Sequence, residues 1–172
     1  MIPGKRPAAA RSGFSLLEVL VSSFILSILA VSLVHGLTTL ELESRLAKDR
    51  MSSALLAADL REEILSKASV DPDGGPQFGP EAGEKGRVRL SLDDQDDYAG
   101  LVDRPVTDIR GNELPGMERI WRACRIERVS PENPDGPSID TAPGGLRRFT
   151  VTVFRDESEL AHLTWLGVGQ EK

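Results

Sequence analysis

The sequence is poor in the residues that form disulfide bonds or structural metal sites. It has one cysteine, Cys124, so an intramolecular disulfide bond is impossible. Its two histidines, His35 and His162, are far apart, and no second cysteine accompanies either, which argues against a structural zinc site. We expect Cys124 to be a small, buried, apolar residue of a strand.

The chain also lacks the positive charge and the motifs of several common classes. Its formal net charge is −6, so a nucleic-acid partner, which needs basic residues to neutralise phosphates, is not expected. The paired glycines at 74–75 and 144–145 lie beside prolines and are typical of turns, not of a phosphate-binding loop. No nucleophile-elbow motif accompanies His162. We therefore expect a non-enzymatic protein of about one domain.

One long apolar segment stands out near the N-terminus. In the 24 residues from Phe14 to Leu37, only Glu18 and His35 can carry charge. A helix of that length spans about 36 Å, enough to cross the apolar core of a bilayer. The preceding residues are basic without an acidic residue; they include Lys5, Arg6 and Arg11. This bias predicts a cytoplasmic N-terminus and an exported C-terminal region.

A conventional signal peptide or a plain membrane anchor is the alternative interpretation. Signal peptidase could cut after Ser32, where small residues stand at the required places. However, the apolar run is longer than the core of a signal peptide. Glu18 also lies early inside the run, where a carboxylate costs about 2.5–3.5 kcal/mol on insertion scales. Such a residue is a functional candidate.

The local sequence around this glutamate is distinctive. It reads Gly13-Phe14-Ser15-Leu16-Leu17-Glu18-Val19-Leu20-Val21. It resembles the class III signal of type IV pilins and type II secretion pseudopilins. The resemblance implies that prepilin peptidase cuts between Gly13 and Phe14 on the cytoplasmic side and N-methylates Phe14. Glu18 is then the fifth mature residue, where that family keeps a glutamate.

The resemblance implies a structural subunit, closest to pseudopilin I or the modification-type minor pilins. Such a chain waits in the inner membrane as a single-pass protein with a periplasmic head. Prepilin peptidase processes it, and an inner-membrane assembly platform moves it into a periplasm-spanning filament beside other pseudopilins. A minor pilin of a type IV pilus or of a DNA-uptake machine is the alternative. An exported binding domain, anchored or led by a signal peptide, is an alternative of another class.

The spacing between Phe14 and Glu18 has a physical interpretation. Cleavage creates an amine at Phe14, and Glu18 lies four residues later, about one helical turn. A buried ion pair between this carboxylate and a neighbour's amine adds little net stability, but it selects one axial offset between subunits. We therefore predict that Glu18 sets register. The alternative is a charge that reaches the cytoplasmic interface without a partner.

Helical periodicity continues from Phe14 to about Ala68 and defines the expected organisation. One apolar face comprises Leu37, Leu40, Ala47, Met51, Ala54, Leu55, Ala58 and Leu65, and a second stripe comprises Leu42, Leu46, Leu60 and Ile64. Two apolar sides require two partners, the head and a neighbouring subunit. The predicted parts are a cytoplasmic leader (1–13), a transmembrane and filament-core helix (14–37), its amphipathic continuation (38–70) and a periplasmic head (71–172).

The head changes to a period of two, which predicts strands. Alternation is seen at Val88–Leu92, Ile120–Ile126 and Arg148–Val153, and Ala161–Trp165 is the expected hairpin partner of the third segment. The chain is therefore expected to be α+β, with a long N-terminal helix packed on a small antiparallel sheet, and the resemblance implies the same pilin-like fold. Long loops at 71–86, 93–116 and 130–145 are expected to carry its specificity.

One acidic loop has the spacing of metal ligands. Asp93, Asp94, Asp96 and Asp97 could supply oxygens to Ca²⁺, and some pseudopilins bind calcium in their heads. The EF-hand pattern is not met, because the required glycine and glutamate are missing. The alternative is a solvated loop, or one bonded to arginines such as Arg104 and Arg110.

Overall fold

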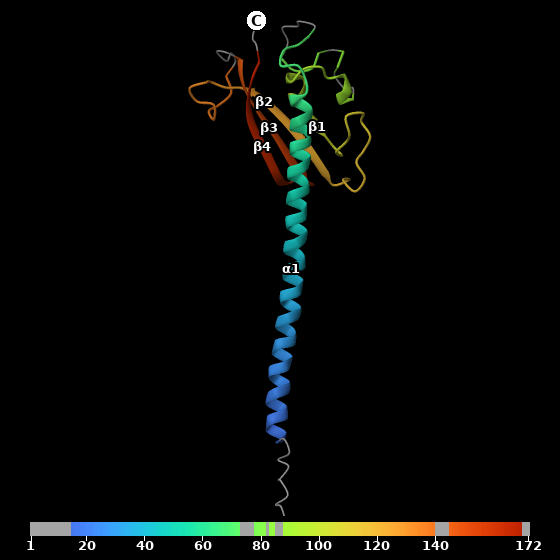
Figure 1. Ribbon diagram of the computed structural model, residues 1–172, viewed down its shortest axis with the longest axis vertical. Coiled ribbons are helices and arrows are strands. Elements are labelled where there is room, and N and C mark those ends of the chain that lie inside the picture. The colour runs from blue at the N-terminus through green and yellow to red at the C-terminus, as the bar shows by residue number, and fades with distance from the viewer. Residues whose placement is uncertain (1–14, 73–77, 82, 85–87, 140–144, 170–172) are drawn as a thin grey trace, which may run out of the picture. The chain divides into compact units, whose positions relative to one another are not determined.

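The computed structural model describes residues 15–72, 78–81, 83–84, 88–139 and 145–169. It divides the chain into two compact units, Met1–Leu46 and Ala47–Lys172. The elements are α1 (Leu16–Leu65), η1 (Arg89–Ser91), η2 (Asp96–Tyr98), β1 (Val102–Asp103), β2 (Ile120–Arg128), β3 (Leu146–Arg155) and β4 (Ser158–Val168) (Figure 1). One long helix and one antiparallel sheet confirm the predicted α+β, pilin-like class.

In the first unit the structure describes Ser15 and the N-terminal part of α1. The second unit contains the rest of this helix. The helix is 50 residues long and ends at Leu65, three residues before the predicted end. Its last turn tightens, since the N–H of Lys67 donates to the Ile64 carbonyl at 3.1 Å. Ala68 then forms a bridge with Asp94, so the chain has already left the helix before Pro72.

The two apolar sides of α1 have different environments in the second unit. Leu60 and Ile64, from the second stripe, are completely buried, as are Ser53 and Ala57 nearby. By contrast, Met51 and the other large apolar residues of the first face are exposed. The C-terminal part of the second stripe therefore packs on the head, whereas Leu42 and Leu46 of the same stripe are exposed, and the first face lacks a partner among the described residues.

The sheet has the order β1-β2-β3-β4, and every neighbouring pair is antiparallel. The predicted strands at Ile120–Ile126 and Arg148–Val153 lie within β2 and β3, and Ala161–Trp165 lies within β4. A two-residue turn joins β3 to β4, with Asp156 at a positive φ of 52°. The short strand β1, which pairs with β2, was not predicted.

The core of the second unit lies between the sheet and the C-terminal part of α1 (Figure 1). Alternate residues of β2 and β3 point toward the helix, and they meet its buried stripe. The buried apolar strand residues are Ile120, Cys124, Ile126, Phe149, Val151 and Val153. Cys124 is 2% exposed, so the expectation of a buried cysteine is confirmed, and burial raises the pKa of its thiol to about 12.

The strand predicted at Val88–Leu92 is wrong. The chain instead forms the single 3₁₀ turn η1, with Val88 and Leu90 exposed and Arg89 buried. The reason is the side chain of Arg89, which reaches inward to Glu63 of α1 and to Asp103. These ionic contacts decide which side of the segment is buried, against its apolar alternation.

Candidate functional site

The predicted processing site precedes the described part of α1. Lys5, Arg6, Arg11, Gly13 and Phe14 lie outside the described residues, so cleavage and methylation remain predictions. The structure begins to describe the signal segment at residue 15, immediately before the helix.

Ser15 and Glu18 form the start of α1. The backbone N–H of Glu18 donates to the Ser15 hydroxyl oxygen at 3.2 Å, and the N–H of Val19 donates to the Ser15 carbonyl. This is the serine half of a capping box, in which serine and a glutamate three residues later are the preferred pair. Glu18 therefore has a local role that spacing to Phe14 alone did not reveal: its carboxylate lies in the first turn, near the positive end of the helix dipole.

The apolar half of α1 is unburied in the described part of the chain. Every residue from 16 to 46 is exposed, and Leu16 is 81% exposed. By length and composition this helix is able to cross a membrane, and its most apolar stretch of 18 residues is unburied. An apolar helix with an exposed surface on all sides requires lipid or other helices around it.

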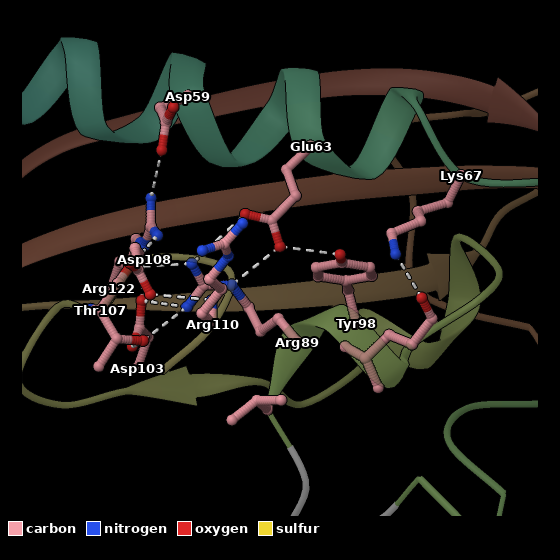
Figure 2. Close-up of polar contacts among 12 residues, drawn as sticks. Asp59, Glu63, Lys67, Arg89, Tyr98, Asp103, Thr107, Asp108, Arg110 and Arg122 are labelled. Carbon is pink, nitrogen blue, oxygen red and sulfur yellow. Dashed lines mark hydrogen bonds and ion pairs between the residues drawn. The ribbon is translucent and has the colours of Figure 1, made fainter. Parts of the chain in front are cut away.

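A network of buried charges fixes the other end of α1 to the head (Figure 2). Arg122 of β2 is completely buried and donates to Asp103 Oδ2 at 2.8 Å and to the Leu56 carbonyl at 3.0 Å. Arg89 donates to Glu63 Oε1 at 2.9 Å and to the same Asp103 oxygen at 2.8 Å. Two guanidinium groups and two carboxylates thus join four separate elements, α1, η1, β1 and β2.

Further hydrogen bonds complete this network. The Tyr98 hydroxyl donates to Glu63 Oε1 at 2.9 Å, and burial, with the negative charge of Glu63, raises the pKa of Tyr98. The Thr107 carbonyl accepts from Arg89 and from Arg122. Sequence reasoning missed this cluster as a unit. The available signal was Arg122 itself, which occupies the same side of its strand as Ile120 and Cys124 and therefore points inward.

The acidic loop folds around its own carboxylates. Asp94 Oδ1 accepts from the N–H groups of Asp96 and Asp97, and Asp97 Oδ2 accepts from those of Asp93 and Asp94. Asp96 pairs with Arg147 of β3 at 2.6 Å. The alternative of an arginine-bonded loop is therefore realised at Asp96 through Arg147, whereas Arg104 pairs with Glu157.

Three carboxylates beside this loop are arranged so that they could hold a cation. Oxygen atoms of Glu81, Glu84 and Asp97 lie within 4.8 Å of one another. Of the four predicted ligands, the structure thus brings Asp97 to such a group and ties Asp96 to a guanidinium. Glu81 and Glu84 were not predicted as ligands, since they lie 12 and 9 residues before Asp93, the first residue of the loop.

The comparison with known proteins adds one finding to this geometry. Residues 9–34 match a protein family described as the prokaryotic N-terminal methylation motif. The chain carries a type IV pilin-like prepilin signal. No curated protein and no solved structure matches the chain. The match spans the predicted cleavage site, Glu18 and the first half of the exposed apolar helix.

Behind this prepilin signal, the acidic loop of the head predicts a pH effect. Burial and the nearby Asp96 and Asp97 carboxylates raise the pKa of Asp94 to about 7, and burial with Glu81 does the same for Glu84. A carboxyl group whose pKa is raised in the folded state contributes its full stabilisation below its pKa in the unfolded chain, about 4. This stabilisation is lost as pH rises through the folded-state pKa of about 7. We expect Tm of the full chain in detergent to fall by roughly 2–8 °C from pH 5 to pH 8.

Calcium provides the second arm of this experiment. If the carboxylates bind Ca²⁺, millimolar Ca²⁺ at pH 8 should restore the lost Tm, and a chelator should reverse the effect. Asp94→Asn removes one buried charge and should flatten the pH profile. A wild-type Tm that does not change between pH 5 and pH 8 contradicts the pH prediction, and no response to Ca²⁺ contradicts calcium binding.

Proposed function

We propose that the chain is a minor pseudopilin, a structural subunit of the periplasmic pseudopilus or of its tip in type II protein secretion. The observation that carries the proposal is the methylation motif at residues 9–34, which continues into an apolar helix without a partner in the described chain. The α+β head behind this helix supports the same conclusion. The role is that of an assembly subunit and involves no catalysis.

The proposed sequence of events starts in the inner membrane. Residues 1–13 are a cytoplasmic leader, and residues 14–37 cross the membrane once, with the head in the periplasm. Prepilin peptidase cuts after Gly13 and methylates Phe14. The assembly platform then extracts the subunit, and residues 14–37 enter the filament core. Residues 38–70 continue the helix, and the head at 71–172 selects its neighbours.

Glu18 is proposed to set the register of this assembly. In the apolar filament core its carboxylate pairs with the methylated amine of a neighbouring subunit. The capping bond between Ser15 and the Glu18 N–H orders the first turn and so fixes the direction in which the carboxylate leaves the helix. One ion pair per subunit then discriminates between axial offsets, because a wrong offset leaves both charges unpaired.

Deletion of the gene in its own bacterium tests the choice of machine. The proposal expects loss of exported type II substrates from the medium while surface pili remain. Complementation by the full-length chain should restore export. Loss of pili or of DNA uptake with normal export would overturn the type II assignment and support a minor pilin of the other machine.

A further inference from the structure

The head half of α1 forms one wall of a groove to which the proposed assembly assigns no partner. The groove has a volume of about 740 Å³ and lies between the helix and the segment around residues 107–117. Its apolar surface comes from Leu55, Leu56, Ile109, Leu114 and Met117. Leu55 is 62% exposed, so the groove opens to solvent along the helix.

The mouth of this groove is acidic. The side chains of Asp59 and Glu62 are both 70% exposed. Asp108 also lines the groove, and its hydrogen bonds from Asn112 hold the pKa of its carboxyl below the usual range. Arg61 contacts Glu62 and Arg110 lies near Asp108, but both pairs are at the surface, where they neutralise little.

The buried cation of the groove does not compensate for this negative charge. Arg89 lines the groove, but its side chain is 5% exposed and is already shared between Glu63 and Asp103. Arg122, which is also buried, donates to Asp59 Oδ2 at 3.3 Å, whereas Glu62 has only the surface Arg61. The exposed part of the groove therefore combines apolar surface with carboxylates that are only partly neutralised. Its complement is an apolar side chain next to a free cation.

The same face of α1 offers that complement a few turns earlier. Lys48 lies 11 residues before Asp59 and 14 before Glu62, which places it within about 40° of both around the helix. Lys48 is exposed and forms no hydrogen bond or ion pair with any described residue. Met51, on the next turn, is 69% exposed. One face of the helix thus changes from basic to acidic along its length.

We infer that this groove binds Lys48 and Met51 of a second copy of the chain, in a parallel and staggered contact. The inference rests on the proposed function. Two helices that face each other without a stagger would oppose Asp59 and Glu62 to themselves, which is repulsive. A stagger of 11–14 residues, about 16–21 Å, instead sets Lys48 against these carboxylates. Met51 then covers the apolar floor.

Such a contact cannot close into a two-fold dimer. The donor patch at Lys48–Met51 and the acceptor groove are different surfaces of one chain, so each bound copy still offers a free donor and a free groove. Contacts of this heterologous kind repeat into a ring or an open helical array. The charge pattern of α1 therefore favours side-by-side assembly of this head with another copy in one direction along the helix.

Zero-length carbodiimide cross-linking tests this contact. The reagent condenses a lysine amine with a touching carboxylate into an amide, with loss of water. Full-length chain co-produced with prepilin peptidase is solubilised in detergent, where no shared bilayer fixes the copies at the same height, as an equal mixture of unlabelled and ¹⁵N-labelled protein. Mass spectrometry should find Lys48 joined to Asp59 or Glu62 in mixed-isotope peptides, which arise only between copies. High salt should lower the yield.

Charge reversal makes the test specific. Lys48→Glu and Glu62→Lys are each expected to lower the mixed-isotope yield at least about fivefold, and the double variant should regain it through an amide between positions 48 and 62. Arg50→Glu is the matched control. It makes the same charge change two residues away, about 200° around the helix, and should leave the yield unchanged.

Three results would overturn the inference. They are a wild-type chain without mixed-isotope products at Lys48, an equal loss in the Arg50→Glu control, and cross-linking of both singly reversed variants at the wild-type level. The mature N-terminus of the same sample is sequenced in parallel. Processing at Phe14 without the Lys48 cross-link removes this contact alone, whereas an unprocessed chain counts against the proposed function itself.

Discussion

A chain that carries Glu18→Ala is expected to lose its leader normally and to enter filaments at least about tenfold less than wild type. Peptidase cleavage depends on the segment around Gly13 and Phe14, which the substitution leaves intact. In the proposed filament, assembly depends on the carboxylate, because without it the neighbouring amine is buried unpaired, and breaking a buried pair costs about 3–5 kcal/mol. The measurement is the amount of processed chain in membranes and in sheared or purified filaments.

Glu18→Gln separates the place of this residue in the capping box, which the structure shows, from its proposed role in register. Glutamine can replace glutamate in a capping box, but it carries no charge to pair with an amine. If register depends on the charge, Glu18→Gln should fail in assembly as completely as Glu18→Ala. Filament entry at the wild-type level by the alanine variant would contradict the register hypothesis. If the Glu18→Gln variant enters filaments normally and the Glu18→Ala variant does not, the role of Glu18 is limited to capping the helix.

The second large effect is expected in the head. Arg122→Ala should lower the free energy of unfolding by about 3–5 kcal/mol, because it removes one of the two buried guanidinium partners of Asp103 and leaves a cavity beside Leu56. Chemical unfolding of the full chain in detergent, followed by tryptophan fluorescence, measures the change. A loss below about 1 kcal/mol would show that the buried network does not hold the head to α1.

Arg119→Ala is the control for this second prediction. Arg119 pairs with Asp156, but its side chain is 74% exposed, so water and salt screen the interaction. Its removal should cost less than about 1 kcal/mol. The contrast between two arginine-to-alanine changes, one in β2 and one immediately before it, isolates the effect of burial from that of losing a positive charge.

The parts of the fold that could be predicted are those with local signals. The apolar run and the prepilin signal are contiguous in sequence, and the strands β3 and β4 follow a clear period of two. The segment at Val88–Leu92 has the same period and still fails. Its conformation depends on Glu63 and Asp103, which are 26 and 14 residues away from Arg89.

The head sites show the same limit. The acidic loop was found because its aspartates are consecutive, but its arginine partner, Arg147, is 51 residues from Asp96. Neither Glu81 nor Glu84 stood out, because each is an isolated carboxylate until the chain folds. Likewise, the helical period showed two apolar sides of α1 and could not tell which side packs on the head. Pairing across long sequence distances determines all three features.

The most direct test of the central claim is the N-terminal sequence and mass of the mature protein from membranes of its own cell. The account predicts a chain that starts at Phe14 and carries one additional methyl group. A chain that starts after Ser32, or that keeps Met1, would contradict prepilin processing and leave an exported or anchored domain of another class.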